Sequence, residues 1–173
     1  MFECLIVVAV FGTLVAVALP SLVDHLARRA VEGVALQLVA DLQYARSEAT
    51  QRSEAVAVTS GTGCHVIHLA SATANCDASG VTVAPPTAAL KSVVHDTRPA
   101  VRVQPLDGLA QVIFESAGST ASFTGAAPGS ETAAWEVGNA QSNLVVRVQV
   151  NLGGRASACV SAGQLPGIPG CAP

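Results

Sequence analysis

The chain has 173 residues, of which 50% are hydrophobic and 12% charged, and its formal net charge is −3 at pH 7. Setting aside an N-terminal segment of about 50 residues leaves about 120, enough for one domain with its own core. The acidic balance argues against general binding of polyanions. Aromatic residues make up only 3% of the chain, so the core must be built mainly from Val, Leu and Ala.

The N-terminus carries an uncharged, strongly apolar run over residues 4–23, preceded by one carboxylate, Glu3. About 20 apolar residues in a helix span the roughly 30 Å hydrocarbon layer of a bilayer. The run therefore predicts a transmembrane helix segment over residues 1–23. The alternative is a signal peptide cleaved after Ala18, which would release a Sec-exported periplasmic binding domain, but the basic n-region of such peptides is missing.

The helical pattern continues beyond Pro20. Apolar residues recur at steps of three and four at Val31, Ala35, Leu38, Leu42, Ala45 and Ala49. Charged residues fill much of the remaining surface, namely Asp24, Arg28, Arg29, Glu32, Asp41, Glu48 and Arg52. This spacing predicts an amphipathic continuation of the helix over residues 24–52. The complete helix would be about 75 Å long, with a bend or a loosened turn at Pro20.

Residues 53–173 predict a β-rich domain. Strand-like segments separated by Gly, Pro, Asn and Asp are Ala55–Val58, Val66–Leu69, Ser92–Val94, Val101–Val103, Val112–Phe114, Ala134–Val137 and Leu144–Val150. Several short strands beside one long helix predict an α+β fold with an antiparallel sheet. Part of the amphipathic helix would be buried against that sheet.

Four of the five cysteines fall into two close pairs, Cys64 with Cys76 and Cys159 with Cys171. In an oxidising compartment the pairs are expected to form disulfides, each closing a short loop worth about 3 kcal/mol in the chain-entropy model. Four cysteines also allow two other connectivities, and reduced cysteines in a cytosolic domain are the remaining alternative.

Two histidines beside the first cysteine pair, His65 and His68, raise the alternative of a zinc site. A spacing of three residues on a strand places them on opposite faces, which spoils convergent ligation. The preferred interpretation is a disulfide with surface histidines. No nucleophile elbow, zinc-protease motif, P-loop or dinucleotide fingerprint occurs in the sequence. We therefore expect no enzyme, with no catalytic residue, no metal and no cofactor.

Several short motifs stand out at the two ends of the chain, namely Glu3, Gly12, Ala18–Ser21 (ALPS), Leu42–Ala49 (LQYARSEA), Gly154-Arg155 with Cys159, and Pro169–Cys171. With these motifs the chain resembles type IV pilins, and more narrowly the GspH/FimT family of minor pilins and pseudopilins in its FimT/FimU-like branch. The resemblance covers residues 3–59 well and the last 25 residues moderately.

The resemblance implies a type IV pilin-like fold and a minor pilin-like structural subunit in type IV pilus assembly or priming. It also implies a single-pass inner-membrane protein with a periplasmic domain, whose partners are other pilins or pseudopilins in the assembled filament. The acid matching Glu3 pairs with a neighbour's N-terminal amine in the assembly core, and Pro20 belongs to the same assembly helix. The alternative within the family is a minor pseudopilin (H-type) of the type II secretion system.

Processing of the N-terminus follows from the same resemblance. Family precursors carry a basic leader that prepilin peptidase removes, after which the new N-terminus is methylated. Only two residues precede Glu3 where the family has four, so we expect a longer precursor with an upstream start.

DNA uptake is a further implication. DNA-binding members of the branch carry Gly-Arg-x-Arg where this chain reads Gly154-Arg155-Ala156-Ser157, without the second arginine. Guanidinium groups suit phosphate contacts, which makes Arg155 the first DNA-binding candidate and Arg147 the second. The cations Lys91, Arg98 and Arg102 would add to them if the fold gathers them. The alternative is a solvated arginine beside a disulfide.

Overall fold

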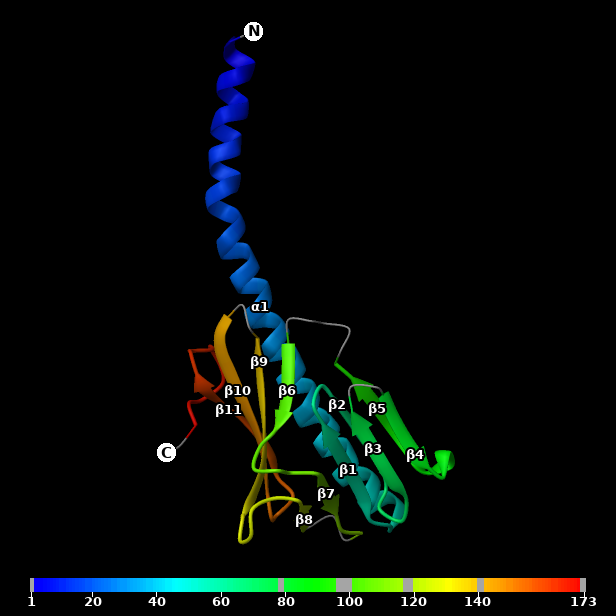
Figure 1. Ribbon diagram of the computed structural model, residues 1–173. Helices are drawn as coiled ribbons and strands as arrows, with labels where there is room; N and C mark the ends of the chain where they lie inside the picture. Colours follow the sequence, from blue (N-terminus) through cyan, green and yellow to red (C-terminus); the bar gives the residue numbers. More distant parts are fainter. Residues whose placement is uncertain (1, 78–79, 96–100, 117–119, 140–141, 172–173) are drawn as a thin grey trace.

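The computed structural model describes residues 2–77, 80–95, 101–116, 120–139 and 142–171, excluding the side chains of 2–21 and 23. One helix, α1 (Phe2–Arg52), runs without a break through Pro20 (Figure 1). Its first half projects as a stalk, and its second half lies against the sheets of the head. The prediction of one continuous helix that becomes the spine of a β-rich domain is confirmed.

The membrane prediction concerns the stalk. Among the residues whose side chains are described, no helical segment is long and apolar enough to cross a bilayer. The apolar run of residues 4–23 lies outside that set except for Leu22, as do the side chains of Glu3 and Pro20. Membrane insertion and the roles of Glu3 and Pro20 therefore stay predictions.

The head contains two antiparallel sheets and a separate hairpin. The five-stranded sheet has the order β5 (Ala89–Val94), β2 (Cys64–Leu69), β1 (Val56–Gly61), β7 (Gln111–Phe114) and β8 (Ala121–Thr124). The four-stranded sheet has the order β11 (Ala156–Ala162), β10 (Ser142–Asn151), β9 (Thr132–Asn139) and β6 (Val101–Pro105). The hairpin joins β3 (Thr73–Asp77) to β4 (Gly80–Ala84), and a 3-10 turn, η1 (Pro86–Ala88), follows it.

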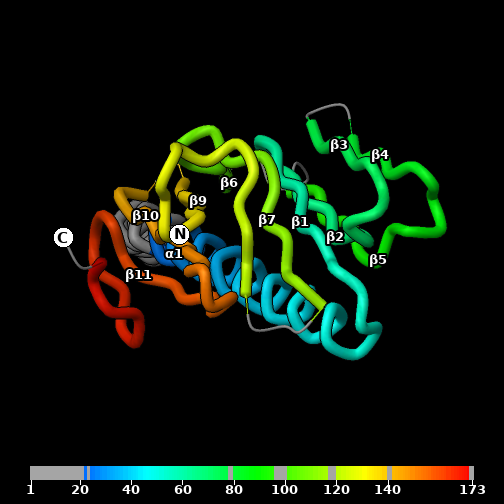
Figure 2. Tube along the Cα trace, turned by 90° about the horizontal axis from the view of Figure 1, so that it is seen from below, coloured from blue at the N-terminus to red at the C-terminus, as the bar shows by residue number. Residues whose placement is uncertain are grey.

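The main core lies between α1 and the inner faces of both sheets. Figure 2, a backbone trace seen from below, shows the second half of α1 running alongside the strands. The buried stripe of α1 consists of the six residues predicted from the sequence, Val31, Ala35, Leu38, Leu42, Ala45 and Ala49, each at most 1% exposed. It belongs to the same cluster as Val146 and Val148 of β10, Val58 of β1 and Trp135 of β9. The hydrophobic periodicity of residues 31–49 is thus explained by burial on one side of the helix.

All seven predicted strands are confirmed, whereas β3, β4, β8 and β11 were not predicted. β11 has the sequence Ala-Ser-Ala-Cys-Val-Ser-Ala, with one β-branched residue, so its alternation is barely visible. Its strand conformation is fixed by pairing with β10, from Gln149 opposite Ser157 to Val146 opposite Val160. Pairing with β10 therefore stabilises a strand conformation that the local residue preferences of β11 do not favour strongly.

Two disulfides join the pairs predicted from spacing, Cys64–Cys76 and Cys159–Cys171. The first ties the start of β2 to β3 and so fastens the hairpin to the head. The second ties β11 to the C-terminal segment, which also accepts and donates backbone hydrogen bonds at Val160. Local connectivity is confirmed, and both pairs close short loops at the edges of the head.

Candidate interaction surfaces and a buried polar cluster

The solvent side of α1 carries a second apolar face. Leu22, Leu26, Leu36 and Tyr44 are 55%, 61%, 48% and 38% exposed. At about 100° per residue, these four side chains fall within a sector of about 80°, and the centre of that sector lies about 180° from the buried stripe. We call these four residues the outer apolar face. The head covers only one side of α1, so the apolar side chains on the opposite side stay exposed to solvent.

Charged side chains on the predicted polar face of α1 form ion pairs with each other within the helix. Arg28 pairs with Asp24 at 2.9 Å and Arg29 pairs with Glu32 at 2.9 Å. Such exposed pairs, three or four residues apart, contribute only about 0.3–0.5 kcal/mol each. They keep the helix surface soluble between the apolar side chains and leave little net charge there.

Asp41 departs from this pattern, because the sequence places it on the polar face and the structure buries it at 3% exposure. Its Oδ2 lies 2.9 Å from Nε2 of His65 on β2, and its Oδ1 lies 2.5 Å from Nζ of Lys91 on β5. Burial alone would raise the pKa of Asp41, but the hydrogen bonds and charges of His65 and Lys91 outweigh burial. The pKa therefore lies below its ordinary value of 3.8, and the carboxylate is ionised.

The cluster extends through His65 to a second imidazole. Nδ1 of His65 lies 3.2 Å from Nε2 of His95, which follows β5, and the two ring centroids are 5.3 Å apart. Both rings are buried, at 1% and 7% exposure. The chain Asp41–His65–His95 therefore links α1, β2 and the end of β5 through side chains alone.

The expectation of surface histidines is wrong for both candidates, since His68 is also fully buried. As expected from strand geometry, His68 points to the opposite face from His65. Its Nδ1–H donates to the carbonyl of Leu69, and its Nε2 lies 2.9 Å from the hydroxyl of Thr59. Burial lowers the pKa of His68, so the ring is held neutral in this site. Among the described residues, no group of three metal-ligating side chains is arranged to bind an ion.

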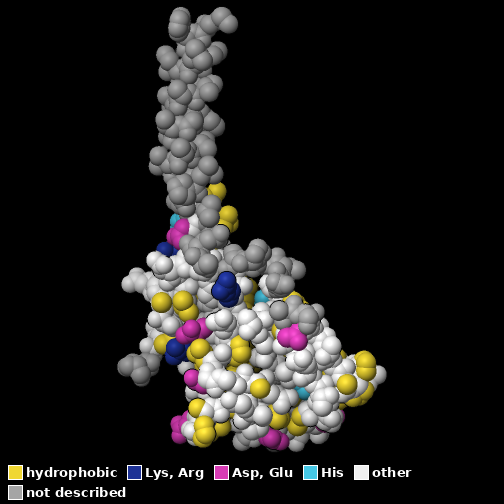
Figure 3. All heavy atoms as spheres, viewed as in Figure 1, with side chains coloured by type: hydrophobic (Ala, Val, Ile, Leu, Met, Phe, Trp, Pro, Cys, Tyr) yellow, Lys and Arg dark blue, Asp and Glu magenta, His cyan; other side chains and the backbone are white. Residues whose placement is uncertain are grey.

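The predicted DNA-binding cations are not gathered. Arg147 pairs with Glu136 at 3.0 Å on the outer face of the four-stranded sheet. Arg147 lies four residues before Asn151 on β10, a distance of about 13 Å along the strand. The backbone N–H of Arg155 donates to the side chain of Asn151. Lys91 belongs to the other sheet, Arg102 stands exposed on β6, and Arg98 lies outside the described residues. Figure 3 accordingly shows basic side chains standing apart on the visible face.

A different arginine lies beside Arg155. Arg46 of α1 donates from Nη1 to the carbonyl of Gly154 at 3.4 Å, where φ is +68°. Arg46 and Arg155 line a groove of about 520 Å³ between α1 and the β10–β11 turn, and among the described residues no carboxylate lines it. The other lining residues are Gln43, Ser47, Thr50, Gln51, Gly154 and Ala156. No pattern in the sequence indicates this pairing, because Arg46 and Gly154 are 108 residues apart.

The fold defines the class of protein to which the chain belongs. A long N-terminal helix packed on an antiparallel β-sheet head is shared with two crystal structures of the type IV minor pilin FimU from Pseudomonas aeruginosa. One matches with a TM-score of 0.54 and 18% identity over 79% of this chain and 95% of that chain. The other matches with a TM-score of 0.52 and 18% identity over 77% and 97%. The chain has a type IV pilin-like fold.

The family follows from the sequence itself. A family model described as type II transport protein GspH matches residues 34–154. The chain therefore belongs to the GspH family of pilin-like proteins. A comparison with curated proteins found no match.

Proposed function

We propose that this protein is a minor pilin-like structural subunit, not an enzyme, that enters a filament through α1 and primes type IV pilus assembly. The observation that carries the proposal is the outer apolar face. The head buries one side of the helix, and Leu22, Leu26, Leu36 and Tyr44 remain exposed on the opposite side. Packing against the helices of other pilin-like subunits would bury this face.

The proposed location is the inner membrane, with the head in the periplasm, before incorporation into a filament. The uncharged run of residues 4–23 supports insertion, and the two disulfides suit an oxidising compartment. Within the proposal, Glu3 meets the N-terminal amine of a neighbouring subunit, because a carboxylate in an apolar bundle needs a partner. Prepilin peptidase would first cleave a longer precursor.

Site-specific photo-crosslinking in the native cell tests this proposal. A photoreactive residue at Leu26 or Leu36 is expected to crosslink to other pilin-like subunits, whereas the same residue at Arg102, exposed on β6, serves as the control. Leu36→Asp is expected to lower incorporation about tenfold or more, because an unpaired buried carboxylate costs more than the 1.4 kcal/mol per tenfold. Crosslinks equal to the control would overturn the proposal.

The same strain separates the alternatives. Loss of surface pili in the Leu36→Asp strain supports the pilus branch, and loss of type II secretion with normal pili supports a minor pseudopilin. A mature protein that begins at Leu19 would instead identify a cleaved signal peptide and an exported periplasmic domain.

A second candidate function is binding of nucleic-acid phosphates in the groove between Arg46 and Arg155. Two guanidinium groups line this groove, and none of its lining residues in the described part of the chain is a carboxylate, which favours an anion with several oxygen acceptors. Mobility shift of duplex DNA with the full chain in detergent tests it. Two phosphate contacts predict a slope of log affinity against log salt of about −1.8. Arg155→Gln is expected to abolish the shift and Arg147→Gln to preserve it, and a shift that is insensitive to salt would exclude this function.

A further inference from the structure

The facing ring nitrogens of His65 and His95 form one hydrogen bond, which contains a single proton. Asp41 is an ionised carboxylate and can only accept, so Nε2 of His65 carries a hydrogen and donates to it. Nδ1 of His65 then faces Nε2 of His95 at 3.2 Å. One of these two nitrogens must donate and the other accept, because a hydrogen bond holds a single proton.

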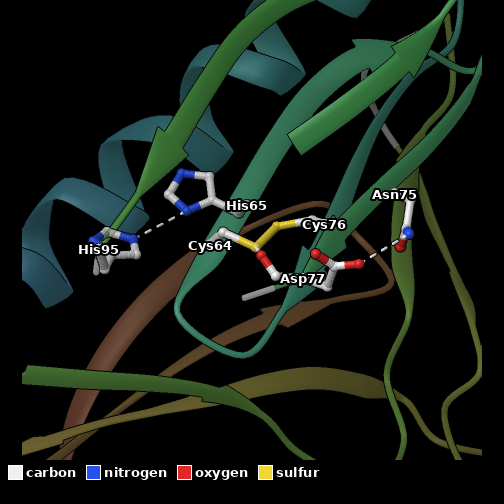
Figure 4. Close-up of a disulfide and its surroundings, with 6 residues drawn as sticks. All are labelled: Cys64, His65, Asn75, Cys76, Asp77 and His95. Carbon is white, nitrogen blue, oxygen red and sulfur yellow. Dashed lines mark hydrogen bonds between the residues drawn. A yellow bond between two sulfur atoms is a disulfide. The ribbon is translucent and has the colours of Figure 1, made fainter. Parts of the chain in front are cut away.

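The pair lies in a site that is closed to solvent. Figure 4 shows the two rings approaching each other, His65 from β2 and His95 from the end of β5, beside the disulfide Cys64–Cys76. Near them among the described residues are Asp41 from α1, which also binds Lys91 of β5, and the hydroxyl of Ser60 across the strand pair on β1. That hydroxyl is buried and has no hydrogen-bond partner among the described residues. Asp96, the next residue after His95, lies outside the described residues.

His95 also stands where the two sheets meet. Its backbone N–H donates to the carbonyl of Gly63 at 2.7 Å, in the β1–β2 turn. The N–H of Gly63 in turn donates to the carbonyl of Val103 on β6 at 3.0 Å. His95 directly follows β5 in the chain, and a change there therefore reaches the β1–β2 turn and then β6 of the other sheet through two consecutive backbone hydrogen bonds.

We propose that the Asp41–His65–His95 chain is an acid-operated latch that joins β5 and the β1–β2 turn to β6. With one shared proton, the imidazoles hold the latch closed. When both facing nitrogens are protonated, two N–H groups oppose each other at hydrogen-bond distance, the bond is lost, and His95 leaves the site. Exposed imidazoles take up protons near pH 6.5, so mild acid supplies the second proton as the latch opens.

Hydrogen exchange of the full chain in detergent micelles tests the latch at about pH 7.5 and about pH 5, on either side of the ordinary histidine pKa. After correction for the intrinsic rate, peptides that cover β5 and β6 are expected to lose protection about tenfold at the lower pH, which corresponds to about 1.4 kcal/mol. Peptides of β9 and β10 are expected to keep theirs. Equal protection of β5 and β6 at both pH values would overturn the latch.

Two matched variants assign the response to the pair. His95→Gln retains a side-chain N–H for Nδ1 of His65 but cannot be protonated, so β5 and β6 are expected to stay protected in acid. His25→Gln, at an exposed histidine of α1, is expected to respond as the parent protein does. An unchanged acid response in His95→Gln would refute the latch and point to another group, such as His68.

Discussion

Replacing Asp41 with alanine is expected to lower the free energy of unfolding by about 3 kcal/mol, because it leaves a buried imidazole N–H without an acceptor. His65 is 1% exposed and cannot turn to water, whereas Lys91, at 42% exposure, can. Most of the loss is therefore assigned to His65. Urea denaturation of the full chain in mild detergent, followed by fluorescence of the single, buried Trp135, measures it.

The controls for Asp41→Ala are an isosteric variant and a surface carboxylate. Asp41→Asn keeps a side-chain oxygen that accepts from His65, so its loss is expected to be clearly smaller. Asp24→Ala breaks an exposed ion pair and is expected to cost at most about 0.5 kcal/mol. An Asp41→Ala protein no less stable than Asp24→Ala would show that the buried cluster adds nothing to stability.

The pH dependence of this difference has a defined sign. The folded-state pKa of Asp41 lies below its ordinary value of 3.8, so its contribution is complete above about pH 4 to 5. It is lost as the pH falls through the lower folded-state pKa, and the parent and Asp41→Ala proteins then converge in stability. A gap that closes already near neutral pH would mean that the histidines, and not the carboxylate, carry the effect.

The cluster also marks the limit of prediction from this sequence. The buried stripe of α1 was predictable because burial of one helix face imposes its period on neighbouring residues. Asp41 was placed on the polar face because an isolated carboxylate belongs in water. Its partners, His65 and Lys91, lie 24 and 50 residues away in the sequence, and no local sequence pattern predicts these contacts.

The histidines show a related limit. Alternation along β2 correctly placed His65 and His68 on opposite faces, but it could not show that both faces are covered. The inner face lies against α1, and the outer face carries Cys64 and Val66, which pack against side chains of the β3–β4 hairpin. That hairpin was not predicted, so its cover over β2 was not predicted either. The groove beside Arg155 was missed for the same reason, since its second arginine comes from α1.

Replacing Leu38 with alanine is expected to cost about 3 kcal/mol in free energy of unfolding, because the side chain is fully buried between α1 and the sheets. The same denaturation experiment measures the loss. If Leu38→Ala left stability unchanged, α1 would not be the spine of the head.

Leu36→Ala is the matched control, since the same residue type lies two positions earlier at 48% exposure. Its effect on the stability of the isolated chain is expected to stay within about 0.5 kcal/mol, while its incorporation into filaments falls. Comparing Leu38→Ala with Leu36→Ala therefore distinguishes the role of α1 in the stability of the head from its role in assembly. The inner side holds the head together, and the outer side is available to neighbours. A Leu36→Ala protein that lost stability like Leu38→Ala, or that assembled normally, would break this division.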